Sequence, residues 1–278
     1  MDEERAAEQE KPPPATRGFS MTRRRAAVEL SVIVAALAAA VFVFVTMAGR
    51  VAAWLTPFIS PELDRRLGEA AAKQQELSGR RCKNPRLLRY VETLTSPLLS
   101  HLPSSAFTYR FTVSESPEVN AFALPGGYVT VNYGLIEAAK SGAEIAAVVA
   151  HEIEHVELRH GTKAILRQLG GWAAISTVFG DTSLQVPAYA LADVTMLTHH
   201  RGQEAEADAR GLELLVAAGI DPAGLATFFE RLEKQGVSPP EFLSTHPDPG
   251  NRAERARAVA RRHPGLAALP KPEGLNCH

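Results

Sequence analysis

The longest apolar run of the chain lies close to its first residues. Residues 30–49 read LSVIVAALAAAVFVFVTMAG and contain no charged side chain. At about 1.5 Å rise per residue, a helix of this length matches a hydrocarbon core about 30 Å thick. The run therefore predicts a transmembrane helix over residues 28–49. A cleaved signal peptide is the alternative, but the run is longer than the usual apolar region of such peptides and no small-x-small cleavage site follows it.

The segment before this run is polar and contains Pro12 to Pro14. It has too few apolar residues to form a core, so residues 1–25 are predicted to be a disordered tail. The tail ends in three arginines, Arg23 to Arg25, and basic residues are sparser just after the run. Because basic flanks stay on the cytoplasmic side of a membrane, we expect a cytoplasmic tail and a C-terminal part outside the cytoplasm. The predicted location is a bacterial inner membrane, single-pass, with the larger part in the periplasm.

After a connector marked by Pro57 and Pro61, the chain shows both strand and helix patterns. Runs of β-branched and aromatic residues predict three strands, over 106–113, 119–124 and 128–132, the last two joined by a tight turn at 125–127. Helices are predicted before residue 100, from residue 141, over 200–217 and 222–235, and up to about residue 262. The predicted fold class is α+β, mostly helical with a small β-sheet, with one domain over 60–265 and a C-terminal tail over 266–278.

Charge and cysteine content narrow the possible partners. The formal net charge is −1, so there is no basic surface of the kind that binds nucleic acid, and nucleic acid is not an expected partner. Two cysteines, Cys82 and Cys277, are too few for a disulfide-built scaffold. Outside the cytoplasm, an even count favours one bridge between them, the alternative being two free thiols.

The strongest chemical pattern lies on the helix predicted from residue 141. Ser141 and Glu144 form a capping box at its start, and the sequence His151-Glu152-Ile153-Glu154-His155 follows within it. Residues i and i+4 share one face of a helix, about 5–6 Å apart, so both imidazoles reach a single metal ion. Glu152 is rotated about 100° from His151, beside the metal, where a general base takes a proton from water. The spacing predicts a catalytic zinc site with Glu152 as its base.

Catalytic zinc usually has three protein ligands, so one more is expected elsewhere in the chain. The position six residues beyond His155, where some zinc proteases carry a histidine, is Gly161. Glu204 and Asp208 are spaced i and i+4 on a predicted helix, so Glu204 can bind the ion while Asp208 holds the distal nitrogen of a ligand histidine. Alone, this segment also fits a solvated acidic face paired with neighbouring arginines. The missing ligand favours Glu204.

These motifs resemble peptidase family M48, zinc metallopeptidases that include HtpX-like, Ste24-like and Oma1-like membrane-linked enzymes. The resemblance covers about residues 60–262 and rests on HEIEHVELRH, the later R-x-x-E-x-E-A-D, the upstream VNAFALPGGYVTVNYGLI and the downstream THPDPGNRAERA. It implies a zincin-like metallopeptidase domain with the HExxH helix under a small sheet, with Glu204 as ligand and Glu206 as a bystander. It also implies that an extended substrate pairs with a sheet-edge strand, which we assign to Asn120, Ala121, Phe122 and Ala123.

His246 lies in the loop THPDPG, whose prolines restrict the backbone. One interpretation is that His246 caps the following helix or bonds the scaffold. The other is that the loop folds over the site, so that the imidazole takes the fourth zinc position and keeps an enzyme latent. The remaining histidines near these motifs are not predicted as ligands: His160, His199 and His200.

The predicted function is that of a membrane-anchored zinc endopeptidase with one Zn²⁺ per chain. Its partners are protein or peptide substrates and the membrane, reached through the N-terminal helix. The predicted substrates are envelope or membrane-associated proteins, in quality control or processing. The alternative of another class is a tethered, zinc-binding, chaperone-like module with little turnover. Glu152 counts against it, since a module that only binds has no need of a base.

Overall fold

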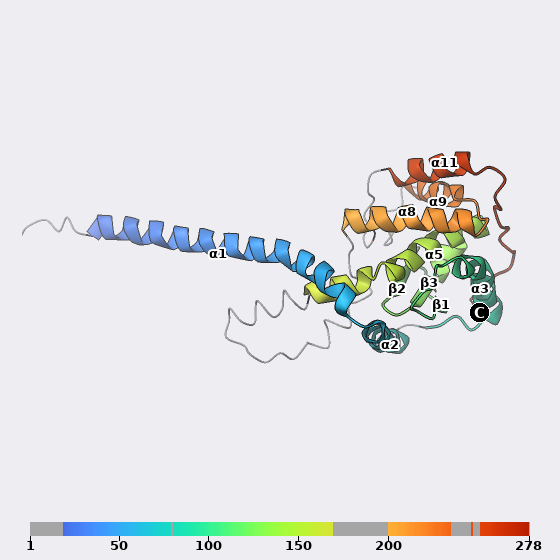
Figure 1. Cartoon of the computed structure of the whole chain (residues 1–278), viewed down its shortest axis with the longest axis horizontal. Coiled ribbons are helices and arrows are strands. Elements are labelled where there is room, and N and C mark those ends of the chain that lie inside the picture. Colours follow the sequence, from blue (N-terminus) through green and yellow to red (C-terminus); the bar gives the residue numbers. More distant parts are fainter. Residues whose placement is uncertain (1–18, 79, 169–199, 235–245, 247–250, 278) are drawn as a thin grey trace, which may run out of the picture. The chain divides into compact units, whose positions relative to one another are not determined.

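In a computed structural model of the chain, we describe residues 19–78, 80–168, 200–234, 246 and 251–277 (Figure 1). They are mainly helical and contain one small sheet, so the predicted fold class is confirmed. The chain divides into two compact units, Met1–Met47 and Ala48–His278, and each is described by itself.

The long helix α1 (Phe19–Leu55) starts in the first unit and ends in the second. Its stretch Arg24–Val43 has a mean hydropathy of 2.5 and is long and apolar enough to cross a membrane. The helix begins at Phe19, inside the segment predicted to be a disordered tail, and residues 1–18 lie outside the described part. A short turn of 3-10 helix, η1 (Thr56–Phe58), follows α1 directly.

The sheet of the second unit has three strands in the order β1-β3-β2. The central strand β3 (Tyr128–Asn132) pairs in parallel with β1 (Arg110–Ser114) and antiparallel with β2 (Ala121–Leu124). Helix α2 (Pro61–Ser78) contacts β2 and β3, and α3 (Pro85–Ser100) packs on β1. Two helices that precede the sheet in the chain thus pack against it.

The turn between β2 and β3 is the one the sequence predicts. Gly126 and Gly127 have φ values of +79° and +96°, a region that glycine adopts without steric cost. Both strands therefore lie where they were predicted, apart from small differences at their ends. The first strand begins at Arg110 rather than at residue 106, because the Ser105 hydroxyl accepts a hydrogen bond from the Phe107 backbone at 3.0 Å and holds it in a turn.

Helix α5 (Gly142–Glu157) is the centre of the second unit. Every residue from 142 to 156 is buried, because α5 lies between the sheet and two later helices, α8 (Arg201–Ala217) and α9 (Ala223–Lys234) (Figure 1). The last helix, α11 (Arg252–Arg262), packs on α9, and the short α4 (Tyr133–Ala138) follows β3. Burial on all sides explains why α5 is apolar from Ile145 to Ala150, between Glu144 and the HExxH motif.

The start of α5 differs in detail from the sequence prediction. At the start, the Ser141 side chain accepts a hydrogen bond from the Glu144 amide, as in a capping box. The Glu144 carboxylate, however, accepts from the amide of Lys140, one residue before the cap. At the other end, α5 ends at Glu157, Arg159 adopts a positive φ of 54°, and the backbone is helical again over residues 160–168.

The segment expected as a C-terminal tail packs against the domain. The amide of Gly142, at the start of α5, donates to the carbonyl of Leu269 at 2.6 Å. The lysine of the segment, Lys271, donates from Nζ to two carbonyls at the end of α4. Cys277 forms a disulfide with Cys82, so the predicted bridge is confirmed.

Candidate metal centre

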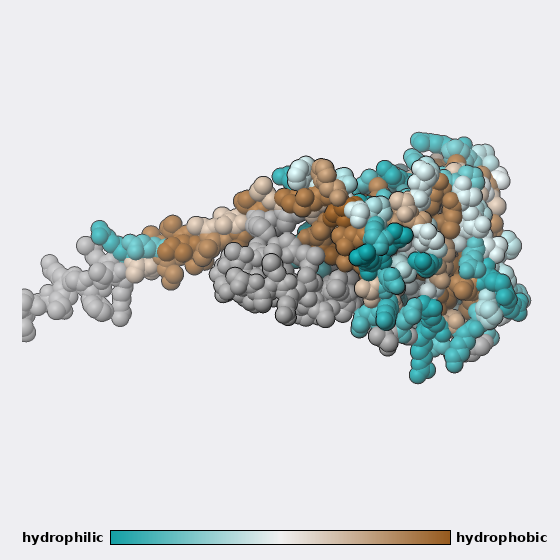
Figure 2. Space-filling model, turned by 60° about the horizontal axis from the view of Figure 1, so that its bottom comes forward, coloured by the Kyte–Doolittle hydropathy of each residue, from teal (hydrophilic) through white to brown (hydrophobic). Residues whose placement is uncertain are grey.

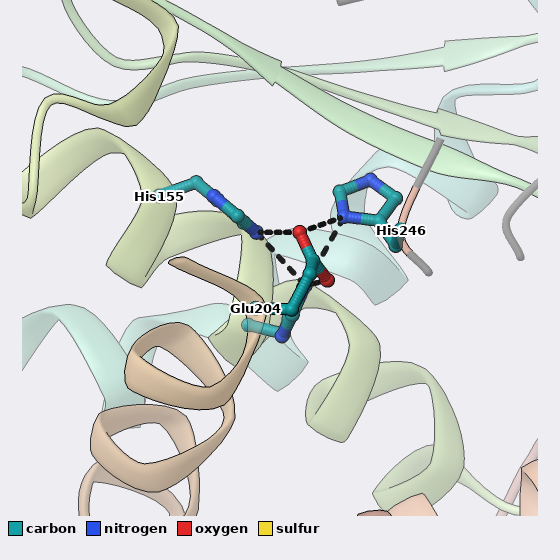
Figure 3. A group of neighbouring side chains, drawn as sticks. His155, Glu204 and His246 are labelled. Carbon is teal, nitrogen blue, oxygen red and sulfur yellow. Dashed lines mark hydrogen bonds and ion pairs between the residues drawn. The ribbon is translucent and has the colours of Figure 1, made fainter. Parts of the chain in front are cut away.

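Four side chains from separate parts of the chain converge beside the C-terminal half of α5. His151 and His155 project from α5 one turn apart, and Glu204 projects from the first turn of α8. His246, which precedes α11, lies against them (Figure 3). All four side chains are buried, and one donor atom of each lies within 4.8 Å of the others. The structure thus brings the predicted ligands and the candidate fourth ligand into one group.

The donor atoms of this group lie close together. The Nε2 atoms of His151 and His155 are 2.9 Å apart. The carboxylate of Glu204 lies 3.2 Å from Nε2 of His151 and 3.3 Å from Nε2 of His155. Nδ1 of His246 lies 3.2 Å from Nε2 of His151 and 3.3 Å from the Glu204 carboxylate.

The protonation that neighbours impose on His151 makes this group suitable for a cation. Nδ1 of His151 lies 2.9 Å from a carboxylate oxygen of Asp208, which holds the ring proton on Nδ1. The lone pair of Nε2 then faces the second imidazole and the Glu204 carboxylate, and such an arrangement of acceptors needs a positive charge between them. Burial lowers the pKa of His151, but Glu204 and Asp208 outweigh it and raise this pKa to about 9. The group therefore attracts a positive charge, which a second ring proton supplies when no metal is bound. The donor set therefore fits a metal ion.

Arg252 is part of the site and was missed in the sequence analysis. Its Nε donates to Asp208 at 2.8 Å, and its Nη2 donates to Glu204 at 2.9 Å. The buried guanidinium lies 4.9 Å from the ring centre of Phe229 on α9. It therefore fixes both acids of α8. Nothing in the sequence sets it apart from the other arginines of α11.

His160, which was not assigned a role in the sequence analysis, also lies at the site. It is fully buried, and its Nδ1 lies 2.9 Å from Nδ1 of His155. Its Nε2 faces the carboxylate of Glu206 at 3.7 Å. The resemblance implied that Glu206 is a bystander, but the structure places it next to this histidine. The spacing of five residues falls outside the i, i+4 rule, because the chain turns at Arg159 between the two histidines.

Glu152 lies next to the donor group without being part of it. Its Oε1 lies 3.5 Å from Nε2 of His246. Burial raises the pKa of this carboxyl, and the nearby histidines and the backbone of Ala123 on β2 act in the opposite direction. The base predicted from sequence is thus buried between the donor group and the strand assigned to substrate pairing.

Strand β2 is an edge of the sheet in the described part of the chain. The Asn120 carbonyl accepts from the Asn132 amide at 3.0 Å, so this residue faces β3. Backbone groups alternate in direction along an antiparallel pair, so those of Ala121 and Ala123 point away from β3. His200 precedes α8 and is its N-cap, accepting from the Gln203 amide, whereas His199 lies outside the described residues.

Comparison with known proteins identifies relatives. Over 202 residues the chain is 33% identical to a putative beta-barrel assembly-enhancing protease of Vibrio cholerae, covering 67% of this chain and 42% of that protein. It is 37% identical over 164 residues to the Arabidopsis thaliana mitochondrial metalloendopeptidase OMA1, covering 56% and 32% of the two chains. It is 30% identical over 181 residues to the Escherichia coli metalloprotease LoiP, covering 63% and 71%. The chain spans less than half the length of the beta-barrel assembly-enhancing proteases that it matches.

A match to a protein-family model agrees with these relatives. The model described as Peptidase family M48 matches residues 82–260, a range that contains the sheet, α5, α8 and His246. This match covers well over half of the chain and includes every member of the donor group. The resemblance inferred from the sequence is therefore confirmed, and the chain belongs to peptidase family M48.

Proposed function

We propose that this chain is a membrane-anchored zinc endopeptidase that hydrolyses peptide bonds in envelope or membrane-associated proteins. The main support is the position of Glu152, a buried carboxyl that lies beside four converging donor atoms and takes no part in that group. A site that only stored a metal would have no use for a buried acid at this place. The names of the relatives, which include a metalloendopeptidase, support the same activity.

In this proposal, His151, His155 and Glu204 hold one zinc ion per chain. When bound, zinc would polarise the scissile carbonyl and lower the pKa of a water. Glu152 takes the proton of that water and passes it to the leaving amine. Asp208 keeps Nδ1 of His151 protonated, so that its Nε2 stays directed at the donor group.

His246 is proposed as a fourth ligand that keeps the enzyme latent. Its Nδ1 lies among the donor atoms, and its Nε2 faces Glu152. An imidazole in this position occupies the space next to the base where a water must be held. Cleavage therefore requires this residue to move aside, as gating loops do in other enzymes.

Substrate is proposed to bind along β2. The backbone groups of Ala121 and Ala123 point away from β3 and are placed to pair with an extended peptide. The backbone of Ala123 also lies close enough to Glu152 to lower the pKa of its carboxyl, so a peptide on this edge passes beside the base. The apolar stretch Arg24–Val43 supports an anchor in a bacterial inner membrane. The second unit, Ala48–His278, is here called the catalytic unit and is proposed to lie in the periplasm.

The test is cleavage of unfolded casein by the purified full chain with and without zinc. Glu152→Gln should abolish cleavage while metal analysis finds unchanged zinc. Glu154→Gln is the matched control, because it changes an acid of the same helix that lies outside the donor group, and it should cleave normally. His151→Ala, His155→Ala and Glu204→Ala should each lose zinc. Full zinc occupancy in Glu204→Ala would refute its assignment as a ligand.

The same experiment separates the enzyme from the chaperone-like alternative. A tethered zinc-binding module would keep unfolded casein soluble and leave it intact, and Glu152→Gln would have no effect on that behaviour. If the chain is an endopeptidase, the Glu152→Gln variant should bind its substrates without cutting them. Proteomics of cells that carry this variant should therefore recover uncut substrates bound to the protein, which identifies the substrate class directly.

A further inference from the structure

The segment that joins α1 to the catalytic unit has an apolar face directed outward. Val51, Trp54, Leu55 and Phe58 follow the spacing i, i+3, i+4, i+7, which places them on one side of the helical segment formed by the end of α1 and η1. Trp54 is 68% exposed and Phe58 is 75% exposed. Their rings lie 5.5 Å apart, which confirms that they share a side.

The other side of this segment is fixed to the catalytic unit. Ala52 and Thr56, spaced i and i+4, are each 3% exposed. Nη1 of Arg159, in the turn after α5, donates to the Thr56 carbonyl at 2.7 Å. The same guanidinium forms an ion pair with the buried Asp64 at the start of α2. The segment is therefore held against the turn that follows the metal-binding helix, with its aromatic side outward.

We propose that this aromatic face, formed by Val51, Trp54, Leu55 and Phe58, lies in the interfacial layer of the membrane and seats the catalytic unit directly on the lipid surface. The proposal rests on the membrane anchor given under the proposed function. In addition, the catalytic unit is not joined to the span by a flexible linker, because Arg159 bonds the segment that carries the aromatic face to the end of α5. Substrate would then be cut close to the lipid headgroups.

Chain continuity favours lipid as the partner of this face. The proposed span ends at residue 49, so Val51 lies within about 7 Å of it in any conformation of the chain. Aromatic side chains concentrate at the headgroup level, where apolar ring surface and polar surroundings meet. Arg50 is exposed beside the face and suits anionic headgroups. Figure 2 shows hydrophobic side chains, in brown, along α1.

The test uses the full chain reconstituted in vesicles of phosphatidylethanolamine and phosphatidylglycerol. The chain has two tryptophans, Trp54 and Trp172, so Trp172→Phe leaves Trp54 as the only reporter. Brominated lipids with bromine near the headgroup end of the acyl chains should quench Trp54. Phe58→Trp, made in a background with both native tryptophans changed to Phe, should be quenched in the same way and shifted to the blue.

Two matched variants in that background complete the test. Phe42→Trp lies within the proposed span and should be quenched by deeply placed bromine, whereas Lys73→Trp, exposed on α2, should not be quenched. Quenching at Phe42→Trp without quenching at Phe58→Trp would overturn the inference and leave the anchor intact. Absence of quenching at Phe42→Trp would instead refute the anchor. Emission at Phe58→Trp that depends on protein density and not on bromine would assign the face to a second copy, which also overturns it.

Discussion

Nδ1 of His160 lies 2.9 Å from Nδ1 of His155, on the side of the His155 ring that faces away from the donor group. Burial lowers the pKa of His160 to about 3, so its ring is neutral. Because Nε2 of His155 is directed at the donor group, its Nδ1 carries the proton and donates to His160. The Nε2–H of His160 then points to Glu206. This arrangement fixes the orientation of His155, as Asp208 does for His151.

His160→Leu should therefore lower zinc affinity about 10–100-fold, the usual effect of losing a partner behind a metal ligand. His160→Asn should retain most of the affinity, since its amide oxygen can stand near the place of Nδ1. Competition with a chelator measures both, and the visible spectrum of the Co²⁺-substituted protein reports the ligand geometry. If the metal-free Leu variant melts at a lower temperature while its zinc affinity is unchanged, His160 has only a packing role.

His246→Ala should retain zinc and cleave casein faster than the unchanged chain, because the ring that lies among the donor atoms and beside Glu152 is removed. Self-cleavage during purification is a second form of the same result. Initial rates at equal zinc occupancy provide the measurement. Slower cleavage at full occupancy would make His246 a substrate-side group, and an unchanged rate would make it structural.

The ion pair at the start of α5 should contribute to stability in a pH-dependent way. Burial raises the pKa of Glu144, but hydrogen bonds from Arg231 and from the Lys140 amide outweigh it and hold the pKa below its ordinary value of 4.5. Because the pKa of Glu144 is lower in the folded state than in the unfolded state, its ionised form stabilises the fold. This stabilisation is fully present above pH 4.5 and is lost as the pH falls through the folded-state pKa.

Glu144→Gln should thus destabilise the unit by about 2–4 kcal/mol at pH 7, since it leaves Arg231 without its partner, and by much less at low pH. Thermal melts in detergent at a series of pH values measure this difference. Glu137→Gln is the control, because Glu137 is an exposed acid on the neighbouring helix α4. An equal loss of stability in Glu144→Gln at pH 7 and at low pH would refute this link between the Glu144 pKa and stability.

Reduction of the Cys82–Cys277 bridge should lower the free energy of unfolding by about 2–4 kcal/mol. The bridge spans 195 residues of sequence and fastens the C-terminal segment beside α3 and β1. Thiol labelling of the denatured, unreduced protein should find no free cysteine. Cys82→Ser with Cys277→Ser should show the same loss of stability without any reducing agent, and a stable double variant would contradict this role.

The direction of insertion is tested by fusing reporters after residue 278. If the catalytic unit lies outside the cytoplasm, alkaline phosphatase fused there should be active and ordinary green fluorescent protein should be dark. The opposite pair of results would place the unit in the cytoplasm.

Local spacing in the sequence was enough to predict the central features of the site. The i, i+4 pairs His151–His155 and Glu204–Asp208 each depend on one helix alone, and the turn at Gly126-Gly127 depends on backbone freedom. Arg252 could not be predicted, because its partners on α8 become neighbours only through tertiary packing. The position of His160 depends on a left-handed backbone at Arg159, a conformation that no pattern of polar and apolar residues reveals.

The contact between the first amides of α5 and the C-terminal segment bears on the timing of activity. The amides of Gly142 and Ala143 donate to the carbonyls of Leu269 and Ala268, so the helix that carries the HExxH motif has no complete amino-terminal cap until residues far downstream have been synthesised. A nascent chain that lacks these residues would hold its histidines on an unfinished helix. The donor group would then assemble late, after most of the second unit has been synthesised.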